Sequence, residues 1–304
     1  MKILLFGMGG QVGWELQRSL APLGELVALG SSGSGDLAGD FRHPDAVAAT
    51  VRTVRPDVVV NAAAYTAVDK AESDREAAHL VNAVAPAAIA RETAACGALL
   101  VHYSTDYVFD GSGDKPWVET DPTGPLSVYG ATKLEGEEGI RRHAPRHLIL
   151  RTSWVYGARG GNFAKTMMRL ARQRDRLTVV SDQIGAPTGA DMLADLAAHL
   201  VRAASTNEAL FGTYHAAAAG ATSWQDYAKF VLGHAVAAGV ALKAGPDAVD
   251  PVPTSGYPTP ARRPLNSRLD TRKLRSTTGL VLPAWEVGVA RMLAEVISEG
   301  ENKT

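Results

Sequence analysis

Residues 2–13, KILLFGMGGQVG, decide the fold of this chain. The apolar run 2–6 predicts a buried strand, and the helical spacing of residues 14–20 predicts the helix that follows it. Residues 26–29 return as a second strand, which completes a βαβ unit. The turn between strand and helix has the spacing Gly-x-x-Gly-x-x-Gly, which lets a pyrophosphate approach the backbone at the helix N-terminus. A glycine-rich turn without a ligand is the alternative.

The alternation of strands and helices continues beyond this unit. Strands are predicted at 58–60, 99–103 and 148–150, and a long alanine-rich helix is predicted to end at Ala95. Alternating elements of this kind indicate a parallel sheet that helices cover on both faces. We therefore expect an α/β protein with a doubly wound parallel sheet.

The second half of the chain has a different character, with loops rich in glycine, proline and serine between helices. Helices are predicted at 192–203 and 224–238, and the proline-rich segment 251–264 is predicted to be an ordered loop or linker. Residues 271–273 and 285–299 suggest closing helices. This half predicts a second, smaller domain.

Composition restricts the classes of partner and compartment. The chain has 304 residues, of which 46% are hydrophobic and 21% charged, and its formal net charge is −1, so neither nucleic acid nor a membrane is an expected partner. The expected partner is a small molecule. The single cysteine, Cys96, favours a reducing compartment, and the N-terminal apolar run is too short for a signal peptide. These features predict a cytoplasmic protein.

The end of the second predicted strand bears on the choice of cofactor. NAD enzymes often place an acid about 20 residues beyond the glycines, on the ribose 2′-hydroxyl. Residues 30–32 are Gly-Ser-Ser instead. Their lack of a carboxylate favours NADPH or dual use, although Asp40 and Arg42 further along complicate the inference.

A tyrosine and a lysine at helical spacing are the candidate catalytic pair. Tyr129 and Lys133 are separated by one turn, so that they lie on one helix face. A free phenol titrates near ~10, and a nearby ammonium favours the phenolate. Tyr129 would give a proton to a carbonyl oxygen that Thr105, at the end of a strand, fixes by hydrogen bonding. Chance spacing for the pair, and ordinary turn chemistry for Ser104 and Thr105, are the alternatives.

Seven segments spread over nearly the whole chain resemble those of the dTDP-4-dehydrorhamnose reductase family, which belongs to the extended short-chain dehydrogenases. They are GQVG (10–13), NAAAYTAVD (61–69), STDYVF (104–109), VYGATK (128–133), RTSWVY (151–156), QIGAPT (183–188) and RPLNS (263–267). The resemblance implies reduction of a 4-keto sugar nucleotide by NADPH, or by NADH, to dTDP-L-rhamnose. It also implies a Rossmann-like domain, mainly 1–152, and a smaller α/β sugar-nucleotide domain, mainly 153–304, with some segments returning to the first.

The resemblance also assigns roles to single residues. The catalytic group is Thr105, Tyr129 and Lys133. The cofactor-binding residues are Gly7, Gly10, Gln11, Val12, Asp40, Phe41, Ala62, Ala63, Ala64, Tyr129 and Lys133. The substrate-binding residues are Val68, Thr105, Tyr107, Tyr129 and Trp154, with aromatic side chains pressing on the apolar side of the sugar. An arginine of the 262–264 stretch can bind a diphosphate or be a solvated surface charge.

Some members of the family form homodimers through acidic residues that hold Mg²⁺ in a structural role. The matching positions here are Glu15, Asp191 and Glu295, all oxygen donors suited to a hard cation. Asp191 is one methylene shorter than the expected glutamate. The resemblance thus implies a Mg²⁺ site and a homodimer, while scattered surface acids are the alternative.

Two other functions remain open at this level. Reduction of the same ketone on its other face would give 6-deoxy-talose, because only the pose of the substrate over the nicotinamide decides the product. The regulatory subunit of methionine adenosyltransferase resembles these reductases, and fold alone does not decide function. The combination of Thr105, Tyr129, Lys133 and Trp154 favours the enzyme.

Overall fold

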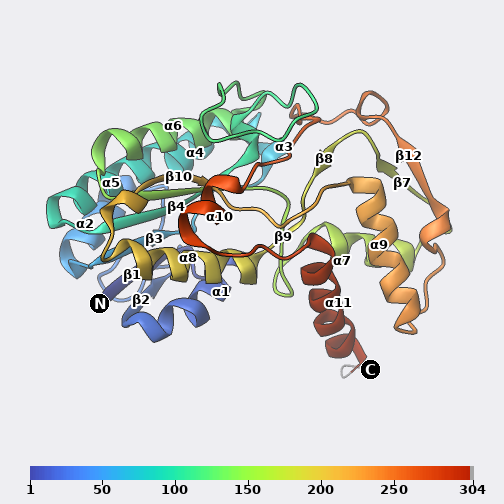
Figure 1. Cartoon of the computed structure of the whole chain (residues 1–304), viewed down its shortest axis with the longest axis horizontal. Coiled ribbons are helices and arrows are strands. Elements are labelled where there is room, and N and C mark those ends of the chain that lie inside the picture. Colours follow the sequence, from blue (N-terminus) through green and yellow to red (C-terminus); the bar gives the residue numbers. More distant parts are fainter. Residues whose placement is uncertain (302–304) are drawn as a thin grey trace.

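A six-stranded parallel sheet forms the larger part of the molecule (Figure 1). The computed structural model describes the backbone of residues 1–301 and the side chains of residues 1–298. The strands lie in the order β10-β5-β4-β3-β1-β2. Their bounds are β1 (Lys2–Phe6), β2 (Glu25–Leu29), β3 (Val58–Asn61), β4 (Leu99–Thr105), β5 (His147–Thr152) and β10 (Gly212–His215).

Helices cover both faces of this sheet because successive side chains of each strand point to opposite faces. Ile3 and Leu5 pack on one side and Leu4 and Phe6 on the other. The first side is covered by α1 (Gln11–Leu20), α8 (Ala190–Ala204) and α10 (Arg272–Thr278), and the second by α2 (Pro44–Val54), α5 (Ala85–Cys96) and α6 (Val128–His143). The predicted doubly wound parallel sheet is confirmed. The second half of the chain contributes α8, α10 and β10 to it.

The predicted alanine-rich helix is interrupted. It consists of α3 (Val68–Ala71), α4 (Arg75–His79), a π-helical turn at Leu80–Val84 and α5. The buried Asn82 lies in the π turn and bonds the backbone of Tyr65, accepting from its N at 2.8 Å and donating to its O at 3.1 Å. A π turn re-aims a side chain that an uninterrupted helix would place elsewhere. The helical periodicity of the sequence did not reveal that Asn82 must reach the backbone of Tyr65.

The remaining segments form a smaller part beside the sheet (Figure 1). Its helices are α7 (Phe163–Ala171), α9 (Trp224–Ala237) and α11 (Trp285–Glu301). Its strands pair in twos: β6 (Val155–Tyr156) with β9 (Thr188–Gly189), β8 (Ile184–Gly185) with β11 (Thr222–Ser223), and β7 (Leu177–Val180) with β12 (Val249–Val252). Short 3₁₀ turns lie at Ala21–Leu23, Asp106–Val108, Glu208–Leu210, Pro246–Ala248 and Thr254–Gly256.

The start of the proline-rich segment differs from the prediction. Pro251 lies inside β12 instead of in a loop, in a sheet of only two strands. Proline is tolerated there because an edge strand has N–H groups that need no ladder partner. Among the described residues no helix is both long and apolar enough to cross a membrane.

The strand order places the site. β1 lies between β2 and β3, so the chain leaves β1 toward one side of the sheet and builds β3, β4 and β5 on the other. In open α/β sheets ligands bind beyond the carboxyl ends of the strands where the order reverses. Here that point is the edge where β1 and β3 end.

Candidate active site

The glycine turn after β1 has no space for side chains at two of its positions. Gly7 has φ +86°, and a Cβ on it would lie 2.6 Å from the backbone N of Ala63 after β3. A Cβ on Gly13 would lie 1.9 Å from the carbonyl O of Gly7. Gly10 precedes α1 without a side-chain cap, which leaves the first N–H groups of the helix without that partner. Such N–H groups favour an anionic ligand.

A cavity of about 790 Å³ opens from this turn along the end of β2. It contains most of the residues predicted to bind cofactor: Gly7, Gly10, Asp40, Phe41, Ala62, Ala63 and Ala64, together with Ser31, Ser32 and Arg42. Arg42 donates to Asp40 through Nη2 at 2.6 Å and through Nε at 3.1 Å. The hydrogen bond from Arg42 lowers the pKa of the Asp40 carboxyl, which stays ionised.

A second cavity, of about 530 Å³, lies beside the first and shares Gly10, Ala62 and Ala64 with it. The structure brings the predicted catalytic and substrate residues together here. They are Val68, Thr105, Tyr107, Tyr129, Lys133 and Trp154, and the cofactor candidates Gln11 and Val12 lie in the same lining. Residues from five distant stretches of sequence thus converge at the carboxyl edge of the sheet. We call this cavity the central cleft.

Two elements position the catalytic candidates. β4 ends at Thr105, whose Oγ1 accepts from the Tyr107 backbone N at 3.2 Å and donates to Asp106 Oδ1 at 3.1 Å. Helix α6 begins after Ser127, whose hydroxyl accepts from the backbone N at Gly130 at 3.2 Å. This N-cap sets the start of the helix and therefore the direction of the side chains in its first and second turns. Tyr129 and Lys133 both point into the central cleft.

Burial controls the charges in the central cleft. It raises the pKa of Tyr129 to about 12, against the effect of a hydrogen bond with Thr105, so the phenol carries its proton. It lowers the pKa of Lys133 to about 8, while the charge of Glu137 acts in the other direction. It also raises the pKa of Asp106 to about 6. The site therefore offers a protonated phenol beside a lysine that can gain or lose a proton near neutral pH.

Trp154 is held in an unusual backbone conformation, with φ +48°. Its ring stacks on that of Trp224, with centroids 3.6 Å apart and planes 13° apart. A Cβ on Gly185 would lie 2.7 Å from the Trp154 ring, so this glycine makes space for it. The first residue of α9, Trp224, also lines the central cleft, and sequence reasoning missed it because nothing local links the two tryptophans.

A third cavity, of about 450 Å³, continues past Tyr107 and Trp224 into the smaller part of the molecule. Arg263 lines it and donates to both oxygens of Asp69, at 3.0 and 2.7 Å. The guanidinium is therefore paired within the chain, and this ion pair joins the proline-rich segment to helix α3.

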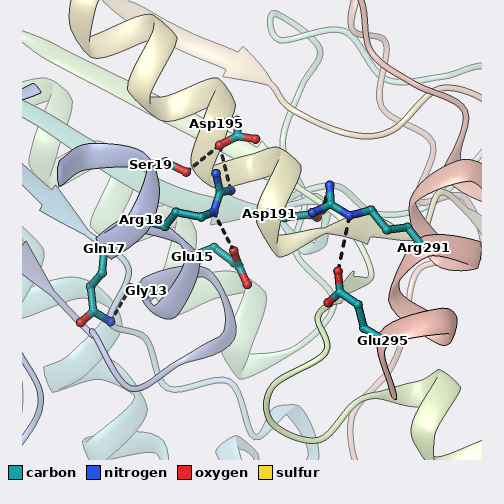
Figure 2. Close-up of polar contacts among 9 residues, drawn as sticks. All are labelled: Gly13, Glu15, Gln17, Arg18, Ser19, Asp191, Asp195, Arg291 and Glu295. Carbon is teal, nitrogen blue, oxygen red and sulfur yellow. Dashed lines mark hydrogen bonds and ion pairs between the residues drawn. The ribbon is translucent and has the colours of Figure 1, made fainter. Parts of the chain in front are cut away.

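Figure 2 shows the acids predicted to bind Mg²⁺ beside arginine side chains. Arg18 contacts Glu15 at 3.4 Å and Asp195 at 3.0 Å, and Arg291 lies 3.5 Å from both Asp191 and Glu295. Over the part of the chain that the structure describes, no three His, Cys, Asp or Glu side chains are grouped to hold a metal ion. Within one chain, arginine guanidinium groups lie beside these carboxylates, and Mg²⁺ binding by Glu15, Asp191 and Glu295 stays a prediction.

Comparisons with known proteins agree with the geometry. Residues 1–298 match the family model described as the RmlD substrate binding domain. The dTDP-4-dehydrorhamnose reductases of Salmonella typhimurium and Escherichia coli K12 are 57% and 56% identical over 298 residues, covering 98% of this chain and 99% of theirs. A crystal structure of the Bacillus anthracis dTDP-4-dehydrorhamnose reductase in complex with NADP has a TM-score of 0.86 at 34% identity, covering 97% of this chain and 99% of that one. The chain belongs to the dTDP-4-dehydrorhamnose reductase family of oxidoreductases.

Proposed function

We propose that this enzyme reduces the 4-keto group of dTDP-4-dehydro-β-L-rhamnose with NAD(P)H to give dTDP-L-rhamnose. The convergence of Thr105, Tyr129 and Lys133 in a cleft that shares its wall with the glycine turn carries the proposal. The names of relatives more than half identical over the whole chain support the substrate.

The chemistry follows from the protonation states of the cleft. A bound reduced nicotinamide supplies the hydride that adds to C4 of the sugar. Thr105 and Tyr129 hold the ketone oxygen, and Tyr129 donates its phenolic proton to that oxygen as negative charge develops. Lys133, buried behind the phenol, stabilises the phenolate that remains, because an opposite charge nearby favours an ionised group.

The three adjoining cavities suggest how the two ligands lie. We assign the adenosine part of the cofactor to the cavity at Asp40 and Phe41, and the nicotinamide and sugar to the central cleft. In the cleft, Val68, Tyr107 and Trp154 contact the sugar, whose deoxy methyl group suits an aromatic wall. The cavity past Trp224 then takes the dTDP group. On this assignment residues 1–152 chiefly bind cofactor and residues 153–304 chiefly bind the sugar nucleotide.

NADPH is the proposed cofactor. The hydroxyls of Ser31 and Ser32 support it because they offer hydrogen-bond donors to a 2′-phosphate, in the same cavity as the Arg42–Asp40 pair. In side-by-side kinetics NADPH should serve at least as well as NADH. A strong preference for NADH would contradict this assignment.

Supplying dTDP-4-dehydro-β-L-rhamnose with NADPH and following cofactor oxidation tests the activity. NMR of the product then identifies its configuration at C4. We expect dTDP-L-rhamnose. The talose epimer would place the substrate with its other face toward the nicotinamide, and no oxidation in the presence of both ligands would favour a non-catalytic regulatory role.

We further propose that two copies associate through the surface of α1, α8 and α11, as the family resemblance implies. Its exposed apolar residues Val281 and Val287 lie beside the Arg291 ion pairs. Association through this surface without Mg²⁺ should survive EDTA, as light scattering of the eluted protein would show. A dimer that dissociates in EDTA would instead indicate that a bound metal ion holds the two copies together.

A further inference from the structure

A buried chain of polar groups lies behind Lys133, on the side away from the cleft. Lys133 Nζ is 3.1 Å from His102 Nε2, and His102 Nδ1 is 2.9 Å from Asn61 Nδ2. Asn61 Oδ1 in turn accepts from the backbone N of Ala63 at 3.0 Å. His102 is fully buried, and Asn61 and Lys133 are nearly so. Each hydrogen bond must therefore be satisfied within the chain.

The hydrogen-bond donors and acceptors in this chain of groups determine which ring nitrogen of His102 carries the proton. Burial, with the charge of Lys133, holds the pKa of His102 well below its ordinary value, so its ring is neutral and has one N–H. The Ala63 N–H needs the oxygen of Asn61, which turns the amide NH₂ toward His102 Nδ1. Nδ1 must then accept, and the ring proton lies on Nε2, facing Lys133. An amine can accept this proton in a hydrogen bond, whereas an ammonium cannot.

We propose that His102, oriented by Asn61, is a positioning residue that stabilises the amine form of Lys133 and so allows Lys133 to return a proton to Tyr129. The proposal rests on the reductase function above. It deepens that function by naming the groups that control the lysine.

The proton steps balance as follows. Tyr129 gives its O–H proton to the ketone oxygen as hydride adds to carbon, which leaves a phenolate. The phenolate takes a proton from the Lys133 ammonium, and the resulting amine accepts a hydrogen bond from His102 Nε2–H. A proton from bulk solvent, entering through the cleft that Lys133 lines, then returns the amine to the ammonium, which supplies the one proton that the reduction consumes. In the ammonium state Nε2 must accept, so the ring proton moves to Nδ1 and Asn61 must turn its oxygen away from Ala63.

The other charged groups around Lys133 are themselves paired or neutral. Glu137 lies one turn further along α6, and its charge raises the pKa of Lys133. That carboxylate is itself paired with Arg151 on β5, at 2.9 and 2.7 Å, and with Arg141 at 2.9 Å. Tyr129, one turn earlier on α6, is neutral in the free site. The second hydrogen bond of Lys133 Nζ goes to the Tyr103 carbonyl O at 2.6 Å, which accepts from an amine and from an ammonium alike.

Two substitutions should let the group at position 102 accept a hydrogen bond from the Lys133 ammonium, and neither leaves a cavity in place of a polar side chain. In His102→Gln, an amide oxygen can accept from the ammonium, with no ring proton to relocate and no added charge. In Asn61→Asp, one oxygen keeps the Ala63 bond and the other accepts from His102 Nδ1–H, so that Nε2 becomes an acceptor. Both variants should raise the pKa of Lys133, by about one unit or more.

The pKa of Lys133 is measured by NMR titration of the whole protein containing ¹³Cε-lysine, with Lys133→Met to assign the signal. This titration needs no substrate, so it separates the proposal from the reductase activity. In active protein the alkaline limb of the kcat–pH profile should move upward with the NMR value. Absence of turnover would then contradict the proposed function and leave the titration to decide the role of His102.

Asn61→Asp also adds a charge, and His102→Leu provides the control for it. In the His102→Leu background only the through-space effect of the carboxylate remains, so the shift caused by Asn61→Asp should fall to less than half. An equal shift in both backgrounds would overturn the proposal. So would an unchanged or lower pKa of Lys133 in His102→Gln.

Discussion

At the scale of single residues, burial determines what Tyr129 can do. Its pKa, raised to about 12, keeps the phenol protonated in the free site, as a proton donor must be. Thr105 counteracts part of this rise, and the phenolate becomes accessible only when further positive charge is nearby. Tyr129 is therefore protonated in the free site and becomes an anion only during the reaction.

Tyr129→Phe tests this donor role directly. The ring and its edge contact with Tyr107, at 5.5 Å between centroids, are kept, so that only the proton is lost. We expect kcat to fall by roughly 10²–10⁴-fold. Cofactor binding, measured by fluorescence titration, should change little. Turnover within tenfold of the unsubstituted enzyme would exclude Tyr129 as the donor.

Asp106 predicts a pH dependence of stability. Burial raises its pKa from the ordinary 3.8 to about 6, so the folded protein binds this proton more tightly than the unfolded chain. The resulting stabilisation is complete below about pH 4, near the ordinary pKa, and is lost as the pH rises through about 6, the pKa in the folded protein. Asp106→Asn, which is always neutral, should therefore gain thermal stability relative to the unsubstituted protein between these values. Unfolding temperatures at a series of pH values check this, and a difference that does not vary with pH would contradict it.

At the scale of elements, the turn between β1 and α1 depends on the absence of side chains. The Gly13 backbone lies directly against the carbonyl of Gly7, since an added Cβ would be 1.9 Å from that oxygen. Helix α1 can approach the end of β1 this closely only with glycine at that position. The glycine spacing thus determines how near the helix N-terminus comes to the cofactor cavity.

Gly13→Ala should move α1 away from the turn, lower the free energy of unfolding by about 1–3 kcal/mol, and weaken NADPH binding. Gly9→Ala is the matched control for unfolding. A Cβ there meets no atom within 4 Å, and the residue does not need a positive φ. Denaturant unfolding of the two variants gives the comparison. Equal destabilisation by both would show that general loss of glycine, and not this contact, matters.

At the scale of the whole molecule, the Asp69–Arg263 ion pair connects helix α3 to the proline-rich segment. Both residues line the third cavity, where we assign the dTDP group. Hydrogen bonding from Arg263 lowers the pKa of Asp69, so the stabilisation by this pair is complete above the ordinary carboxyl pKa and is lost as pH falls through the lowered pKa of the folded protein.

Asp69→Asn should raise KM for the sugar nucleotide several-fold with little change in kcat, because the segment would no longer be held against the cavity. Partly exposed pairs contribute less than about 1 kcal/mol, so stability should change little. Arg263→Lys keeps the charge but not the two parallel hydrogen bonds, and should give an intermediate KM. Steady-state kinetics measure both values. A loss of kcat at unchanged KM would place the pair in the chemistry instead.

The sequence by itself determined the features that depend on local spacing. The alternating strands and helices, the glycine turn and the single-turn separation of Tyr129 and Lys133 are all visible within a few residues, because helix and strand periods repeat locally. The motifs also led to Thr105, Val68, Tyr107 and Trp154, which the structure brings into one cleft.

Only the tertiary structure decided the contacts between distant segments. Asn61 meets His102 because β3 and β4 are neighbours in register, and Trp224 meets Trp154 across 70 residues of chain. Arg291 meets Asp191, one of the acids expected to bind Mg²⁺, for the same reason, because α11 lies beside the start of α8. No local period encodes the strand order or the helix packing that creates these pairs.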